Sequence, residues 1–223
     1  MIKTLKITSI FILSYLLAIS ANARPVSYPG GWTAMQMNNA NMNALHVHYS
    51  PTAKYSIGYK GEYWKEDKWQ FHGLQYNYLV NRWNKKASQA NLYLKSAVGV
   101  AHSDESSFSN KLEDAGFIGI ATDWEDRRFF TSYENRYTYA GDINKSFMQK
   151  ARVGIAPYVG DYGDLHTWLM LQVQHNPTFE GKEIITTPMV RVFKDVYLFE
   201  AGMSFDGDVL LSLIHISEPT RQD

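Results

Sequence analysis

Sulfur and imidazole side chains gather between residues 35 and 48, where Met35, Met37 and Met42 come shortly before His46 and His48. Thioethers and imidazoles are soft to borderline ligands that suit copper. Two histidines separated by one residue share a strand face, so both rings can reach one ion. One hypothesis is therefore a copper site made of His46, His48, Met35 and Met37. The alternative is that both methionines face lipid and the histidines are ordinary polar residues inside a barrel.

A second chemistry is suggested by Ser50, which follows His48 by two residues and so lies on the same strand face. A hydroxyl beside an imidazole can become a nucleophile, as in outer-membrane phospholipases and lipid A deacylases, which use such groups on the lipid-facing wall. The chain has neither a G-x-S-x-G nor an H-E-x-x-H motif. We therefore expect no enzyme, and a membrane-embedded lipid-modifying hydrolase is kept as an alternative.

Charged and apolar side chains alternate along two consecutive segments, 129–139 and 147–158. In the first, Tyr133 shares one face with other aromatic residues and Glu134 takes the opposite face. In the second, Arg152 alternates with apolar neighbours in the same way. Because side chains in a strand alternate with period two, each segment has one apolar surface and one charged surface.

A soluble β protein buries its apolar surface, whereas a membrane barrel turns that surface to lipid and its charges to the lumen. An outward charge at the bilayer centre costs about 2–4 kcal/mol, so a membrane barrel requires the charges to point inward. When the charged faces of the predicted strands are turned inward, they form a narrow charged lumen or constriction. Its residues are Lys95, Glu134, Arg136, Lys150, Arg152, Arg191 and Glu200, with Gln172 and Gln174 beside them.

The inward charges are expected to pair, Glu134 with Lys150 or Arg152 and Glu200 with Arg191. One interpretation is a salt-bridge network that fills and stiffens a small barrel. The other is a charged constriction that selects solutes.

The first residues favour export. Residues 1–23 have the pattern of a cleaved signal peptide, with Lys3 and Lys6, an apolar run over 10–19 and a small-residue site at 21–23. The apolar run is shorter than the roughly 20 residues that a helical span needs. Any membrane residence must therefore come from strands.

The last residues are unusual. The run from Leu211 to Arg221 resembles the in-frame translation of a sequencing adapter. We therefore divide the chain into a signal peptide (1–23), a barrel (24–210) and a non-native tail (211–223), which would truncate the last strand. His215 and Glu218 are given no functional role.

The composition narrows the function classes. The chain has no cysteine, which excludes disulfides and thiolate metal sites. Lys+Arg and Asp+Glu are equal at 22 each, and this balance argues against nucleic acid as a partner. Aromatic residues make up 14%, and such rings are common at membrane interfaces.

Period-two alternation predicts twelve strands, most of them near the roughly ten residues of a tilted transmembrane strand. They cover residues 32–37, 43–50, 55–63, 69–82, 90–101, 115–124, 129–139, 147–158, 165–175, 185–193, 196–205 and a last strand from 209. In bacterial barrels the outer connections are longer than the periplasmic ones. If the N-terminus is periplasmic, alternate connections lie outside. The two longest predicted connections, 102–114 and 176–184, then both lie outside.

As a whole, the mature chain resembles the small, porin-like outer-membrane β-barrels of Gram-negative bacteria. The resemblance rests on the signal peptide, the period-two strands, the aromatic strand ends and the lack of cysteine. It implies an all-β, antiparallel transmembrane barrel with a channel-like or structural role. Outer-membrane lipids and the barrel-assembly machinery would be its partners, with small solutes or metal ions in the lumen. A copper-handling barrel is a further alternative, and a soluble lipocalin-like barrel is the structural one.

Overall fold

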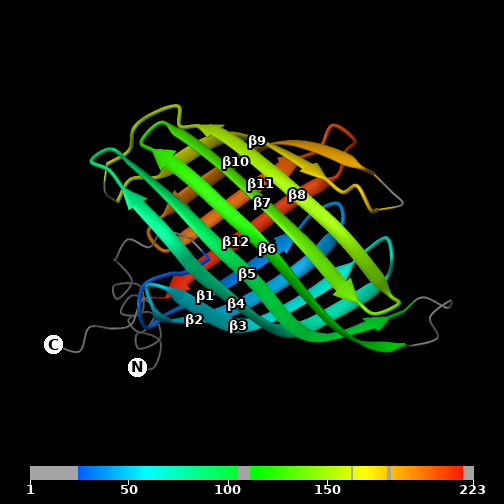
Figure 1. The fold of residues 1–223 in the computed structure, drawn as a ribbon. Coiled ribbons are helices and arrows are strands. Elements are labelled where there is room, and N and C mark those ends of the chain that lie inside the picture. The colour runs from blue at the N-terminus through cyan, green and yellow to red at the C-terminus, as the bar shows by residue number, and fades with distance from the viewer. Residues whose placement is uncertain (1–24, 105–110, 162, 180–181, 218–223) are drawn as a thin grey trace, which may run out of the picture.

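The computed structural model describes residues 25–104, 111–161, 163–179 and 182–217. In these residues twelve antiparallel strands form one closed barrel, and each strand pairs with its neighbours in sequence (Figure 1). β1 pairs with β12, so the sheet has no free edge. The predicted all-β antiparallel barrel is confirmed. The predicted signal peptide lies outside the described residues, and these contain no helix long and apolar enough to cross a membrane.

The strands begin and end within three residues of the predicted bounds. They are β1 (Gly31–Asn38), β2 (Met42–Thr52), β3 (Tyr55–Trp64), β4 (Trp69–Asn84), β5 (Ser88–Ser103), β6 (Leu112–Asp126), β7 (Phe129–Ala140), β8 (Asn144–Ile155), β9 (His166–His175), β10 (Ile184–Lys194), β11 (Tyr197–Met203) and β12 (Val209–Ser217). Alternation was sufficient to locate them because each strand has one apolar and one polar face along most of its length.

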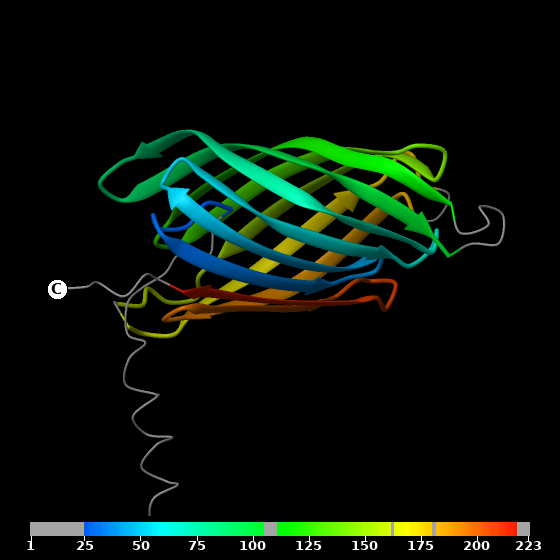
Figure 2. The same cartoon turned by 90° about the horizontal axis from the view of Figure 1, so that it is seen from below.

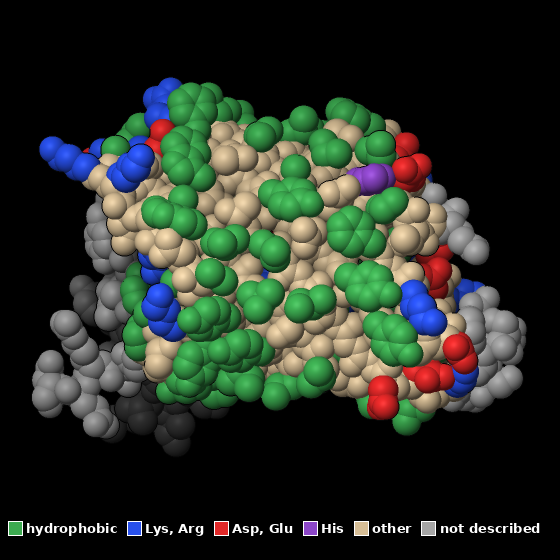
Figure 3. Space-filling model, viewed as in Figure 1, with side chains coloured by type: hydrophobic (Ala, Val, Ile, Leu, Met, Phe, Trp, Pro, Cys, Tyr) green, Lys and Arg blue, Asp and Glu red, His purple; other side chains and the backbone are tan. Residues whose placement is uncertain are grey.

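The apolar faces point outward. Val98, Ile118 and Val153 are 72%, 54% and 56% exposed, and many tyrosines and leucines are exposed around them. On the face seen in Figure 3, lysine, arginine, aspartate and glutamate gather toward the two ends, and hydrophobic side chains cover much of the band between. The alternative of a soluble barrel that turns its tyrosine and leucine faces inward is therefore wrong.

The two ends of the barrel carry different connections, and Figure 2 shows them at opposite sides of the molecule. We call one end the plug end; it carries the connections 39–41, 65–68, 104–111, 141–143, 176–183 and 204–208. The opposite end, which we call the vestibule end, carries 53–54, 85–87, 127–128, 156–165 and 195–196.

The expectation about the longest connections is wrong in one respect. The longest connection is 156–165, at the vestibule end, because β8 stops at Ile155 instead of continuing to Tyr158. Pro157 has no backbone N–H and cannot donate to a strand ladder. The hydroxyl of Tyr158 bonds to the Thr167 hydroxyl across the connection at 2.9 Å.

The closing strand includes residues that were predicted to be foreign. Residues 211–217 belong to β12, which pairs with β1 and β11. Leu210, Ser212, Ile214 and Ile216 point inward and are buried. The alternating side chains of this run fit a strand, so it completes the barrel wall. The foreign origin of 211–223 stays a prediction, and 218–223 lie outside the described residues.

Candidate functional site

The lumen contains two adjoining cavities. A vestibule of about 620 Å³ opens at the vestibule end, and a smaller chamber of about 220 Å³ lies deeper inside. Lys95, Glu134, Arg152 and Arg191 line both cavities, so they stand where the vestibule meets the chamber. Pro25, in the segment before β1, also lines both, and its carbonyl accepts a hydrogen bond from the Ser56 hydroxyl at 2.7 Å.

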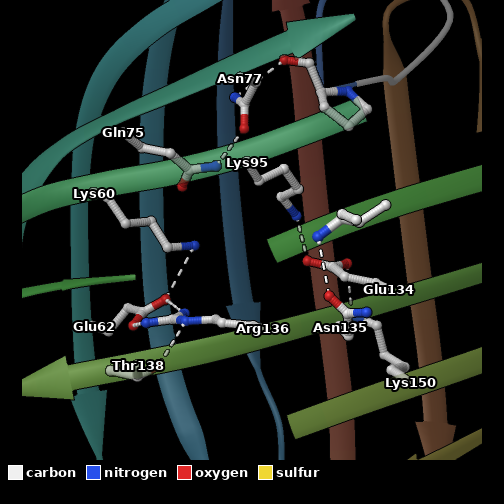
Figure 4. A network of polar contacts seen from close by, with 12 residues as sticks. Lys60, Glu62, Gln75, Asn77, Lys95, Glu134, Asn135, Arg136, Thr138 and Lys150 are labelled. Carbon is white, nitrogen blue, oxygen red and sulfur yellow. Dashed lines mark hydrogen bonds and ion pairs between the residues drawn. The ribbon is translucent and has the colours of Figure 1, made fainter. Parts of the chain in front are cut away.

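The first ion cluster lies in the chamber and surrounds Glu62 of β3. Arg136 of β7 reaches across the lumen and donates two hydrogen bonds to the carboxylate, at 2.7 and 2.8 Å (Figure 4). Lys60, two residues from Glu62 on the same strand, is 3.4 Å from the same carboxylate. A bidentate arginine–carboxylate pair is strong and directional, and Thr138 accepts a third bond from Arg136 at 2.9 Å.

The second ion cluster surrounds Glu134 of β7. Lys95 of β5 donates a hydrogen bond to one carboxylate oxygen, and Lys150 of β8 lies 3.4 Å from the other oxygen (Figure 4). Lys150 is the direct partner of Glu134 in the β7–β8 ladder. Lys95 comes from the far side of β6, so this contact spans three strands.

The third ion cluster surrounds Glu200 of β11. Arg191, its direct partner on β10, approaches to 2.7 Å, and Arg152 of β8 approaches to 3.1 Å. Arg152 also donates a hydrogen bond to the Gln172 side chain at 2.8 Å. Arg191 lies over the Phe130 ring, 4.5 Å from its centroid. Arg152 therefore pairs with Glu200, whereas the alternative expectation was that it pairs with Glu134.

The three clusters have the same composition, since each places two cations around one carboxylate. All seven residues predicted for the lumen point inward and take part, and Gln172 and Gln174 are buried on the same side. Lys60 and Glu62 were missed. The signal was present, because Tyr59 and Tyr63 alternate with them along a predicted strand and are exposed on the outer face.

The plug end of the lumen is filled by apolar side chains. Trp64 and Trp69 stack with ring centroids 5.4 Å apart and an interplanar angle of 3°, and Phe179 packs on Trp64 at 5.5 Å. Trp69 and Phe71 are fully buried. We call Trp64, Trp69, Phe71 and Phe179 the aromatic plug. On the opposite wall, the buried residues Gln172, Gln174, Asn176 and Thr187 fill the same end.

Arg136 joins the plug to the first ion cluster. Its guanidinium lies 3.7 Å from the Phe117 ring centroid and 5.6 Å from that of Trp64, while it also binds Glu62. A cation over an aromatic face is attracted by the ring quadrupole, and the attraction grows when water is excluded. A change at Arg136 therefore affects both regions.

The candidate copper ligands lie on one inner wall. Met35 is directly opposite His46 in the β1–β2 ladder, and both line the chamber with Met37. The expectation that the two methionines face lipid is therefore wrong. His46 and His48 are buried with ring centroids 4.5 Å apart. His46 Nε2 and both ring nitrogens of His48 have no hydrogen-bond partner among the described residues.

Two observations weigh against a metal at this wall. Lys60 is the partner of His46 on β3, which places a cation beside the candidate ligands. Within the described ranges, no group of three or more histidine, aspartate or glutamate side chains could hold an ion. Any site here would depend on the methionine sulfur as a ligand.

Ser50 does not form a dyad with His48 in the described structure. Its hydroxyl contacts the Ser27 hydroxyl at 3.0 Å and accepts a hydrogen bond from the Ser27 amide at 3.1 Å. Ser50 is fully buried and faces the inside of the barrel. A lipid hydrolase would need its nucleophile at the lipid-facing wall.

Comparison with known proteins adds little to this geometry. No protein-family model matches the chain, and no curated protein sequence matches it. One similar solved structure is the KdgM porin in complex with disordered oligogalacturonate, with a TM-score of 0.49 and 6% identity over 85% of this chain and 99% of that chain. OccK8 (OprE) of Pseudomonas aeruginosa gives a TM-score of 0.42 with 9% identity, over 82% of this chain and 62% of OccK8. OccK11 (OpdR) of the same organism gives 0.41 with 9% identity, over 82% of this chain and 63% of OccK11. The chain thus spans less than two thirds of the length of the two OccK proteins.

Proposed function

We propose that the protein is a channel-like barrel of the outer membrane that admits small hydrophilic solutes into its charged lumen. The proposal rests on two features taken together. The outer band of the barrel is apolar, and the lumen is lined by charged side chains and entered through a vestibule of about 620 Å³. An apolar exterior is stable against acyl chains, and a charged interior requires water or polar solutes. Lipids and the barrel-assembly machinery are its expected partners.

In this proposal the plug end faces outward and the vestibule faces the periplasm. The connections 104–111 and 176–183, two of the three longest, lie at the plug end, and outer loops are the longer ones in such barrels. The aromatic plug then closes the route to the outside in the conformation described. Conduction requires a displacement of the plug, and the vestibule and chamber hold solute behind it.

The proposal is tested by reconstitution of the refolded protein in planar lipid bilayers. We expect resolvable conductance steps, with a changed step size for Arg152→Ala, because this side chain stands where the two cavities meet. Heat-modifiable mobility on a denaturing gel shows whether each sample is a folded barrel. A folded barrel that stays silent at all voltages and after opening of the plug would refute the channel.

A second candidate, soft-metal handling, is favoured by the unpartnered nitrogens of His46 and His48 beside Met35. Two imidazoles and a thioether without a carboxylate suit a soft monovalent ion such as Cu(I) better than a hard cation. Titration with Cu(I) or Ag(I) tests it, with His46→Ala/His48→Ala as the deficient variant. His72→Ala is the matched control, because His72 is exposed outside and bonds Tyr59 at 2.7 Å. Equal affinity in all three proteins would exclude this wall as the site.

A further inference from the structure

The charges inside the barrel do not balance, although those of the whole chain do. The chain has 22 basic and 22 acidic residues, whereas the chamber is lined by six cations and three carboxylates. The six cations are Lys60, Lys95, Arg136, Lys150, Arg152 and Arg191, and the carboxylates are Glu62, Glu134 and Glu200. Each ion cluster therefore carries one positive charge in excess, and the chamber carries three.

We infer that this chamber is a binding site for small oxyanions, that is, solutes with carboxylate, sulfate or phosphate groups. The inference rests on the proposed function and names the class of solute that the lumen selects. A charge removed from water is costly unless an opposite charge and hydrogen bonds compensate it. Three buried carboxylates compensate three of the six cations, and a bound anion would compensate the others.

The geometry leaves donors available for such an anion. Lys60 and Lys150 are 3.4 Å from their carboxylates, longer than the 2.7–2.9 Å of a well-formed charge-assisted hydrogen bond. An ammonium group has three donors, so each lysine can bind a second oxygen without leaving its carboxylate. Both side chains line the chamber, and neither lines the vestibule.

The excess of positive charge increases from the vestibule toward the chamber. The vestibule is lined by five basic residues and four acidic ones, because Asp123, Glu125 and Asp126 near its mouth offset Lys85 and Arg127. The chamber has six against three. A charged cavity with low-dielectric walls focuses the field and concentrates counter-ions. Rings of lysine and arginine serve the same purpose in anion pores.

The volume limits the size of the solute. A chamber of about 220 Å³ is below the roughly 300–1,000 Å³ of pockets that hold drug-sized molecules. Inorganic oxyanions and small organic acids fit, and longer acidic chains would have to extend into the vestibule.

The test removes the excess charge and leaves every carboxylate with one partner. The triple variant Lys60→Met/Lys150→Met/Arg152→Gln retains Arg136 for Glu62, Lys95 for Glu134 and Arg191 for Glu200. The converse variant Glu134→Gln removes a carboxylate and so raises the excess positive charge of the chamber by one. Lys54→Met is the matched control, because Lys54 is exposed and lines neither cavity. Heat-modifiable mobility checks that each variant folds, and Lys150→Met alone serves if the triple variant does not.

Two measurements are made on each protein. Reversal potentials in a KCl gradient give the chloride-to-potassium permeability ratio, and calorimetric titration of the folded barrel in detergent gives the affinity for sulfate. We expect a wild-type preference for chloride of about tenfold, at the low end of field-focusing effects. The triple variant should lose that preference and its sulfate binding, and Glu134→Gln should increase both.

The outcomes separate this inference from the channel itself. Conductance that prefers potassium, or that is equally selective in the triple variant, overturns the oxyanion site and leaves the channel intact. A folded barrel that stays silent at all voltages and also after opening of the plug refutes the channel, and sulfate binding then decides the site. Sulfate affinity that is absent, or unchanged in the triple variant, overturns it.

Discussion

The two ends of the lumen are built from different chemistry. At the plug end, stacked indoles and buried amides fill the barrel, and Trp69 is fully buried. At the vestibule end, a cavity of about 620 Å³ leads to three ion clusters. Apolar packing resists the entry of water and sets whether the path is open, whereas fixed charges set which solute is stable inside it. In the proposed channel, access and selection would therefore depend on separate residues, which can be changed independently.

Arg136 is the exception, because it contacts both regions. It binds Glu62 of the first ion cluster and lies over Phe117 and Trp64 near the plug. Its position suggests that a charge bound in the chamber and the packing of the plug affect each other. Variants in each region separate access from selection, and those at the plug should have the largest effect.

Removal of the aromatic plug should have the largest effect. In Trp64→Ala/Trp69→Ala the lumen loses two stacked rings, and we expect conductance to rise well above that of the wild type with ion preference retained. Trp83→Ala is the matched control, because Trp83 is 49% exposed on the outer surface. Single-channel recording measures the difference. Equal conductance in the wild type, the double variant and the control would mean that these rings do not close the path.

Loss of the residue that joins the two regions should be the largest effect on stability. Arg136→Met leaves Glu62 buried with Lys60 alone at 3.4 Å, and breaking a buried ion pair costs about 3–5 kcal/mol. Urea unfolding of the barrel in lipid measures the change. Lys150→Met is the comparison, because Glu134 keeps its hydrogen bond from Lys95 and the loss should be smaller. Equal losses of unfolding free energy in the two variants would show that the bidentate bond of Arg136 stabilises the barrel no more than the contact of Lys150 does.

The outer surface common to both ends gives the next prediction. Leu74 is 51% exposed in β4, and Leu74→Arg places a charge on the apolar band. We expect a loss of about 2–4 kcal/mol in lipid, the cost of a cation at the bilayer midplane. The same substitution at Thr52, exposed at the end of β2 near the vestibule rim, should cost less. A neutral result for Leu74→Arg would contradict the membrane assignment.

The smallest effect concerns the rim of the plug end, where the Lys182 ammonium donates a hydrogen bond to Asp208 at 2.9 Å. This bond lowers the pKa of Asp208 and raises the pKa of Lys182. The carboxylate therefore stabilises the contact above its unfolded pKa and ceases to do so as pH falls through its lowered folded value. The ammonium stabilises the contact below its unfolded pKa and ceases to do so as pH rises through its raised folded pKa.

The contact should accordingly hold between these two limits and weaken in acid and in strong base. Hydrogen exchange of the amides in 204–208 measures it, because the Asp208 amide itself donates to the Ser204 hydroxyl. Asp208→Asn should make exchange faster at neutral pH and remove the acid transition. High salt should reduce the effect, since both side chains of the pair are partly exposed to solvent.

Residue order alone predicted the number of strands, their bounds to within three residues and the inward position of Lys95, Glu134, Arg136, Lys150, Arg152, Arg191 and Glu200. These properties depend on alternation along one strand, which is local and is written directly in the residue order. The pairing of Glu134 with Lys150 and of Glu200 with Arg191 also followed, because each pair lies on adjacent strands.

Which charges meet across the lumen depends on the closed fold and could not be read from the residue order. Glu62 meets Arg136 from β7 and Glu134 meets Lys95 from beyond β6, and these distances depend on how the closed barrel tilts and staggers its strands. The same closure brings Phe179, which follows β9, onto Trp64 of β3, with ring centroids 5.5 Å apart. Contacts between distant strands are not encoded in any local period. The contacts of the charges across the lumen and the packing of the plug therefore became visible only once the barrel was closed.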